Sequence, residues 1–98
     1  MMTPQQREDL LREAVERGRY AKLYHKLKSL PGNEWSASFD EIEQLLSPHT
    51  LPKSARLYRP WWANDARGSH THANAWLLAG FITARVDLAG ETLVFVRK

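Results

Sequence analysis

Cysteine is absent from this chain of 98 residues, which excludes disulfides, thiolate nucleophiles and cysteine-based zinc sites. No apolar run approaches the roughly 18 residues that a membrane-spanning helix needs. The N-terminus is charged where a signal peptide would have its apolar core. Internal repeats and low-complexity stretches are also missing. These absences predict a cytoplasmic protein with no membrane segment.

The composition is that of one small folded unit. Hydrophobic residues make up 43% and charged residues 26% of the chain, which is unlike a disordered segment. The length of 98 residues leaves no room for a multidomain enzyme. The net charge is +3, with an acidic block over residues 31–50 between two basic blocks, 1–30 and 51–98. This polarity favours an anionic partner, although a solvated basic face without any partner is about as common.

The first 30 residues carry two helical patterns. Thr3, Pro4 and Gln6 form a helix start with a capping box, and a narrow apolar stripe through Leu10 and Val15 predicts a helix over 4–17. A second apolar stripe continues over 20–30, and because Gly18 weakens the continuity, the two stripes predict either two helices or one bent helix. We therefore expect residues 1–18 to be an N-terminal helical extension and residues 19–98 to be a single domain.

The remaining patterns mix helices and strands. Alternating apolar residues predict a strand over 34–39, and Ser38 with Glu41 forms a second capping box that opens a helix through Leu46. Helices are expected over 53–59 and 70–79, the latter capped by Ser69, with a β-hairpin over 82–96. The fold class is therefore predicted as α+β, winged helix-turn-helix-like, with helices followed by a C-terminal β-hairpin.

In that arrangement the helix over 53–59 is the candidate recognition helix. Lys53, Arg56 and Arg59 recur every three residues, so they can lie along one outer face while Ala55 and Tyr58 pack inward. Cations on an exposed helix face suit phosphates, but a surface helix whose arginines do nothing specific has the same pattern.

The segment 60–76 is unusually rich in aromatic and polar groups. Adjacent tryptophans cannot easily both point into one core, so Trp62 is either a core residue or a surface ring that stacks on a base. Asn64 and Asp65 are expected to form hydrogen bonds with the nearby backbone and so to shape a turn. If the segment binds nucleic acid, Asn64 and His70 are further candidates, beside Trp62, for contacts to bases. Arg67 would bind phosphate.

Catalytic signatures are missing. His70 and His72 are two residues apart, which turns them about 200° from each other on a helix and prevents them from chelating one metal. There is no glycine-rich phosphate loop, nucleophile elbow or credible carboxylate pair. We expect no enzyme activity, no metal and no cofactor.

Residues 20–98 resemble a family of short bacterial domains of unknown function. The motifs that carry the resemblance are LPKSAR at 51–56, WWAND at 61–65, and Ala75, Trp76, Ala79 and Gly80, together with Tyr20, Leu23, Phe39, Glu41, Ile42, Glu43, Phe95 and Arg97. The resemblance implies domain boundaries and carries no activity.

Two functions compete at this stage, and a third, an unrecognised hydrolase or nuclease, would need His70, His72 and a carboxylate to converge. The first is a nucleic-acid-binding module, with DNA as the first candidate, and its predicted contact residues are Lys53, Arg56, Arg59, Trp62, Asn64, Arg67, His70, Arg85 and Arg97. The second is a protein interaction module, such as an accessory or inhibitor protein, that docks through its N-terminal helix or pairs that helix in a homodimer.

Overall fold

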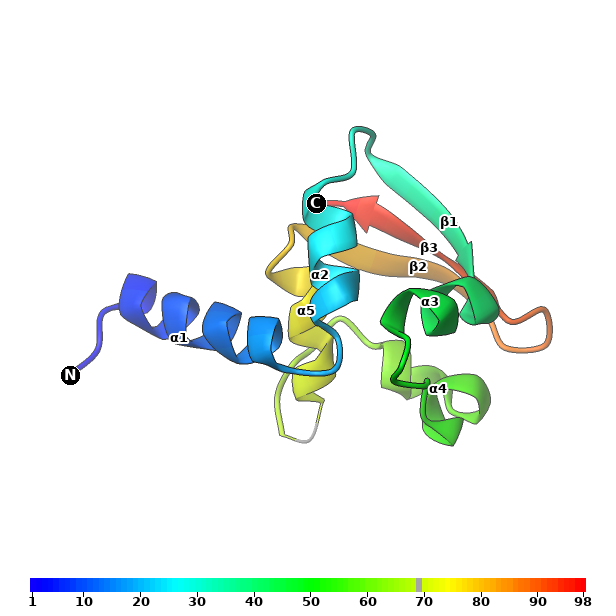
Figure 1. Ribbon diagram of the computed structural model, residues 1–98, viewed down its shortest axis with the longest axis horizontal. Coiled ribbons are helices and arrows are strands. Elements are labelled where there is room, and N and C mark those ends of the chain that lie inside the picture. Colours follow the sequence, from blue (N-terminus) through cyan, green and yellow to red (C-terminus); the bar gives the residue numbers. More distant parts are fainter. Residues whose placement is uncertain (69) are drawn as a thin grey trace.

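Helices and one short strand come first along the chain and a β-hairpin closes it (Figure 1), which confirms the α+β prediction. The structure is a computed structural model that describes residues 1–68 and 70–98. Its elements are α1 (Pro4–Arg17), α2 (Ala21–Lys28), β1 (Glu34–Ser38), α3 (Phe39–Leu46), α4 (Lys53–Leu57), the 3₁₀ helices η1 (Arg59–Trp62) and η2 (Thr71–Ala73), α5 (Asn74–Leu77), β2 (Phe81–Asp87) and β3 (Thr92–Arg97).

Both predicted capping boxes are present. Thr3 Oγ1 accepts a hydrogen bond from the Gln6 amide at 3.1 Å, and the Gln6 side chain accepts one from the Thr3 amide in return. Ser38 and Glu41 form the same reciprocal pair at the start of α3. Each box satisfies backbone amides that a helix start leaves without partners, which fixes where α1 and α3 begin.

The three strands form one antiparallel sheet in the order β1-β3-β2. Ala37, Leu93 and Phe95 are buried beneath the helices, and the residues that alternate with them on each strand are more exposed. A bulge interrupts the pairing of β2 with β3 between Ala84 and Asp87, and Arg85 adopts a left-handed φ of 50° there.

Aromatic rings dominate the core. The Trp62 ring stacks on Phe39 with centroids 5.3 Å apart, and it contacts Trp76 at 5.8 Å. Trp61 meets Trp62 edge to face at 4.7 Å, so both tryptophans of the pair are accommodated inside. The rings of Trp61, Trp62 and Trp76 therefore join η1 to α3 and to α5.

Two predicted helices are shorter than expected. The helix from Lys53 ends at Leu57, because Pro60 has no amide to continue it and the chain turns into η1 instead. In place of a helix over 70–79, the 3₁₀ turn η2 leads into α5, which ends before Gly80 at a left-handed φ of 90°. The predicted cap Ser69 lies outside the described residues.

Helix α1 projects away from the rest of the molecule (Figure 1), which measures 45 Å along its longest axis. None of its residues is buried, and Val15 near its end packs partly against the core. Across residues 1–68 and 70–98, no helix has the length and apolar character needed to cross a membrane.

Candidate nucleic-acid interface

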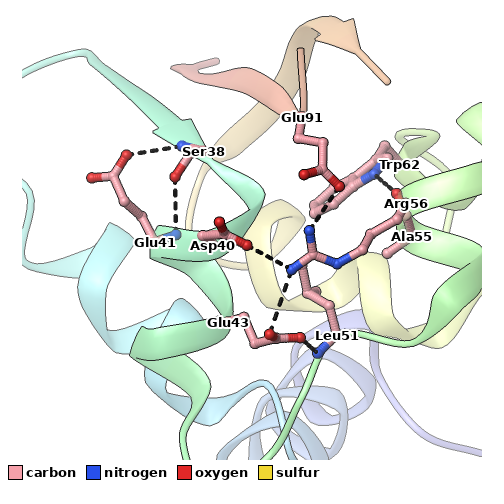
Figure 2. Close-up of polar contacts among 9 residues, drawn as sticks. All are labelled: Ser38, Asp40, Glu41, Glu43, Leu51, Ala55, Arg56, Trp62 and Glu91. Atoms are coloured by element: carbon pink, nitrogen blue, oxygen red, sulfur yellow. Dashed lines mark hydrogen bonds and ion pairs between the residues drawn. The ribbon is translucent and has the colours of Figure 1, made fainter. Parts of the chain in front are cut away.

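Arg56 on α4 is surrounded by carboxylates. Its guanidinium lies 2.8 Å from Glu91 on the hairpin, and 3.0 Å from Asp40 and 3.4 Å from Glu43 on α3 (Figure 2). The hydrogen bonds that Arg56 donates to Glu91 and Asp40 raise the pKa of Arg56 above its ordinary value. The charge predicted to meet phosphate is thus directed into the protein, where it ties α4 to α3 and to the hairpin.

The other residues of the predicted recognition helix divide between two environments. Lys53 and Arg59 are exposed, although the Arg59 guanidinium donates a hydrogen bond to the Val86 carbonyl. Ala55 is buried as expected, but the prediction that Tyr58 packs inward is wrong, because α4 ends at Leu57 and Tyr58 leaves the helix with 56% of its surface exposed. Lys53 lies on α4 and Arg59 on η1, so the two exposed cations do not share one helix face, and two cations make a weak phosphate-binding site.

Trp62 lies in the core, which resolves the alternative that its sequence context left open. Its side chain is 2% exposed, and its indole Nε1 donates a hydrogen bond to the Ala55 carbonyl at 2.7 Å. No face of this ring is available for a nucleotide base.

Asn64 is the centre of a polar network that reaches β2. Its Oδ1 accepts hydrogen bonds from Trp76 Nε1 at 3.0 Å, from the Thr83 amide at 2.8 Å and from Thr83 Oγ1 at 3.0 Å. Its Nδ2 donates to the Thr83 carbonyl at 3.1 Å. The side chain does not bond to the neighbouring backbone as expected, because it is used to hold the loop against the strand.

The rest of the loop is paired locally. Asp65 binds the Arg67 guanidinium at 2.7 Å and accepts its backbone amide at 3.0 Å, and these bonds lower the pKa of the Asp65 carboxyl. The ring centroids of His70 and His72 are 5.5 Å apart. His72 stacks on Trp61 at 3.9 Å, and burial lowers the pKa of its imidazole.

The hairpin cations also have partners. Arg85 lies 3.6 Å from Glu34 across the open face of the sheet. Arg97 donates to the carbonyls of Leu30 and Gly32, both at 3.0 Å, so its charge is held beside the C-terminal end of α2 without a carboxylate. Arg97 therefore lies at one end of the hairpin, whereas Arg56 and Arg59 contact Glu91 and Val86 near the other end.

A different cationic surface surrounds α2. Residues 19–33 contain four Lys and Arg and no Asp or Glu. Leu23, Tyr24 and Leu27 face the core, which leaves the other face of the helix to solvent. We define the α2 surface by its exposed residues Lys22, His25, Lys26 and Lys28, together with Arg97 and Lys98 at the adjoining end of β3 (Figure 1).

Within residues 1–68 and 70–98, the ion pairs use Arg12, Arg17, Arg56, Arg67 and Arg85. No carboxylate of the described chain pairs with a member of the α2 surface. Lys22 donates to the Ser47 carbonyl, and Lys26 lies over the ring of Trp35. The sequence does contain a signal for this surface, because the 15 residues 19–33 include Lys and Arg but no Asp or Glu. Counting the net charge of residues 1–30 as one block hides this signal, since the acidic residues of α1 are counted with it.

The histidines form no metal centre with neighbouring acids in the described part of the chain, where no three His, Cys, Asp or Glu side chains are grouped closely enough to hold an ion.

A family model described as "Domain of unknown function (DUF7662)" matches residues 20–98, which leaves α1 outside the matched range. No curated protein and no solved structure matches the chain.

Proposed function

The chain belongs to the DUF7662 family, and from the geometry of this member we propose that the domain binds nucleic acid through the α2 surface. The observation that carries the proposal is the gathering of Lys22, Lys26 and Lys28 on one exposed helix, beside Arg97 and Lys98, with no acidic residue between positions 19 and 33. Such a surface attracts a polyanion, since each phosphate contact releases condensed counterions.

A winged-helix-like arrangement is part of this proposal. The element order supports it, with α3 and α4 in the place of the helix-turn-helix and β2–β3 in the place of the wing. The Arg56–Glu91 ion pair supports it further, because it holds α4 against the hairpin. In the arrangement that we propose, the main phosphate contacts come from α2, and Lys53 and Arg59 add secondary contacts.

The experiment compares two variants that each lose three positive charges. The first replaces Lys22, Lys26 and Lys28 by Gln, and the matched control replaces Lys53, Arg59 and Arg85 by Gln. Binding to a labelled DNA oligonucleotide is measured at several salt concentrations. For the α2 variant, we expect the slope of log K against log salt to become less steep by about 2 to 3, or about one for each lost phosphate contact. The control should keep most of the wild-type slope.

Two results would refute the proposal. Wild-type protein that binds no nucleic acid at low salt removes the function, and equal weakening of the two variants shows that net charge, and not the α2 surface, sets the affinity. A larger loss in the control variant would move the interface to α4 and the hairpin.

A second candidate function is self-association through α1, which we propose because Leu10 and Leu11 are 51% and 39% exposed on a helix with no buried residue. An apolar stripe that the body of the protein leaves uncovered can be buried by the same stripe of a second copy. This candidate is compatible with the first, since α1 and the α2 surface share no residue.

A further inference from the structure

Trp35 is the tryptophan that remains within reach of a ligand. It lies on β1, an edge strand of the sheet, and is half-buried. The other three tryptophans, Trp61, Trp62 and Trp76, are 8%, 2% and 0% exposed. The Trp35 ring stacks on Phe95 with centroids 5.7 Å apart and an interplanar angle of 17°, so the core holds the indole in a fixed orientation.

The α2 surface adjoins this ring. The Lys26 ammonium lies 5.2 Å from the centroid of Trp35, in a cation–π contact, and Lys22 is one helical turn away on the same side of α2. An aromatic platform beside a row of cations combines the two elements by which proteins hold single strands without reading their sequence.

We propose that the ligand of the α2 surface is single-stranded nucleic acid, one base of which stacks on Trp35. The stacked base takes the place of the Lys26 ammonium, which then moves to the adjacent phosphate. This inference rests on the proposed function of the α2 surface. A duplex does not satisfy it, because paired bases are stacked on one another and present no free face to an edge-strand indole.

The test uses a single-stranded oligothymidylate and a DNA duplex of the same length. Wild-type protein should bind the single strand more tightly than the duplex and lose part of its tryptophan fluorescence on binding. Trp35→Leu should weaken single-strand binding by about tenfold or more, the effect expected for one stacking aromatic, and should abolish the quenching. Its duplex affinity, which comes from the cations, should be unchanged.

Two further variants serve as controls. Trp35→Phe keeps an aromatic ring on Phe95 and should retain much of the single-strand affinity without the quenching. Tyr58→Leu removes an exposed aromatic far along the chain from α2 and should leave single-strand affinity at the wild-type level. Thermal unfolding of each variant verifies that the fold is intact.

The outcomes separate the two proposals. Equal affinity for both oligonucleotides, quenching that persists in Trp35→Phe, or the same loss in Tyr58→Leu would overturn the stacking inference and leave the α2 surface as a site for nucleic-acid phosphates alone. Failure of the wild-type protein to bind either oligonucleotide would overturn the proposed function itself.

Discussion

Asn64 shows how one side chain can be essential to the fold without touching a ligand. Its carbonyl oxygen satisfies the indole of Trp76, which is 0% exposed, and the amide and hydroxyl of Thr83, which is 7% exposed. Replacing Asn64 by Ala leaves the Trp76 indole and the Thr83 amide buried without this acceptor, whereas the Thr83 hydroxyl keeps the Trp62 carbonyl at 2.6 Å. We expect Asn64→Ala to lower the free energy of unfolding by about 2–4 kcal/mol, measured by urea denaturation.

The neighbouring position provides the control. Asp65 pairs with Arg67 at the surface, where such a pair contributes little. Asp65→Asn should therefore change the midpoint of unfolding only slightly. Similar losses for the two variants would contradict the network role of Asn64.

The sequence allowed a local interpretation of these residues and no more. Asp65 does bond to the amide two residues on, as its short side chain predicted. Asn64 and Trp62 instead bond to groups that are 19 and 7 residues away, at Thr83 and Ala55. A residue type indicates which hydrogen bonds are available, but the packing of the whole chain selects the partner.

At the scale of elements, Arg56 joins three of them. It reaches Glu91 on the hairpin and Asp40 and Glu43 on α3, so its removal leaves three carboxylates close to one another. We expect Arg56→Met to reduce the free energy of unfolding by about 1–2 kcal/mol, since charged hydrogen bonds at a partly exposed site are lost. High salt should shrink the difference from wild type by screening the charges.

Lys53→Met on the same helix is the matched control, because Lys53 is exposed and forms no ion pair within the described residues. Its effect should stay within about 0.5 kcal/mol. A double-mutant cycle of Arg56→Met with Glu91→Gln should give a coupling free energy above about 0.5 kcal/mol. If the two changes in the free energy of unfolding are additive, the ion pair does not stabilise the contact between α4 and the hairpin.

Elements whose signals are local could be predicted from the sequence. The starts of α1 and α3 follow from capping boxes that span three residues, and the hairpin follows from alternation on either side of a turn. The end of α4 at Leu57 follows from Pro60, whereas η2 and α5 are held by tertiary contacts of Trp61 and Trp76. Those contacts have no counterpart in local propensity.

For the whole molecule, the arrangement of charge decides the function that we propose. Counting charges predicted an anionic partner, and the predicted contacts came from the helix over 53–59, the loop after it and the hairpin, without any residue of 22–28. In the folded chain Arg56 and Arg67 are neutralised by acids, whereas the α2 surface combines cations from residues 22–28 with Arg97 and Lys98. Only the fold brings the two ends of that surface together.

Helix α1 determines the oligomeric state that we expect in solution. It is attached to the body near its C-terminal end, where Arg12 Nε donates to the Tyr24 hydroxyl, and its leucines Leu10 and Leu11 remain exposed. A helix of 14 residues draws most of its stability from burial of an apolar face. We expect light scattering to detect a dimer, at about twice the 11.3 kDa chain mass, as concentration rises.

Replacing both leucines by Gln preserves helix propensity and removes the apolar stripe, so this variant should stay monomeric at every concentration. Leu57→Gln is the control, because Leu57 is 76% exposed on a different element and should leave the dimer intact. A wild-type protein that stays monomeric, or a dimer that survives the change at Leu10 and Leu11, would show that α1 pairs with no second copy. The uncovered stripe would then be available to a different protein.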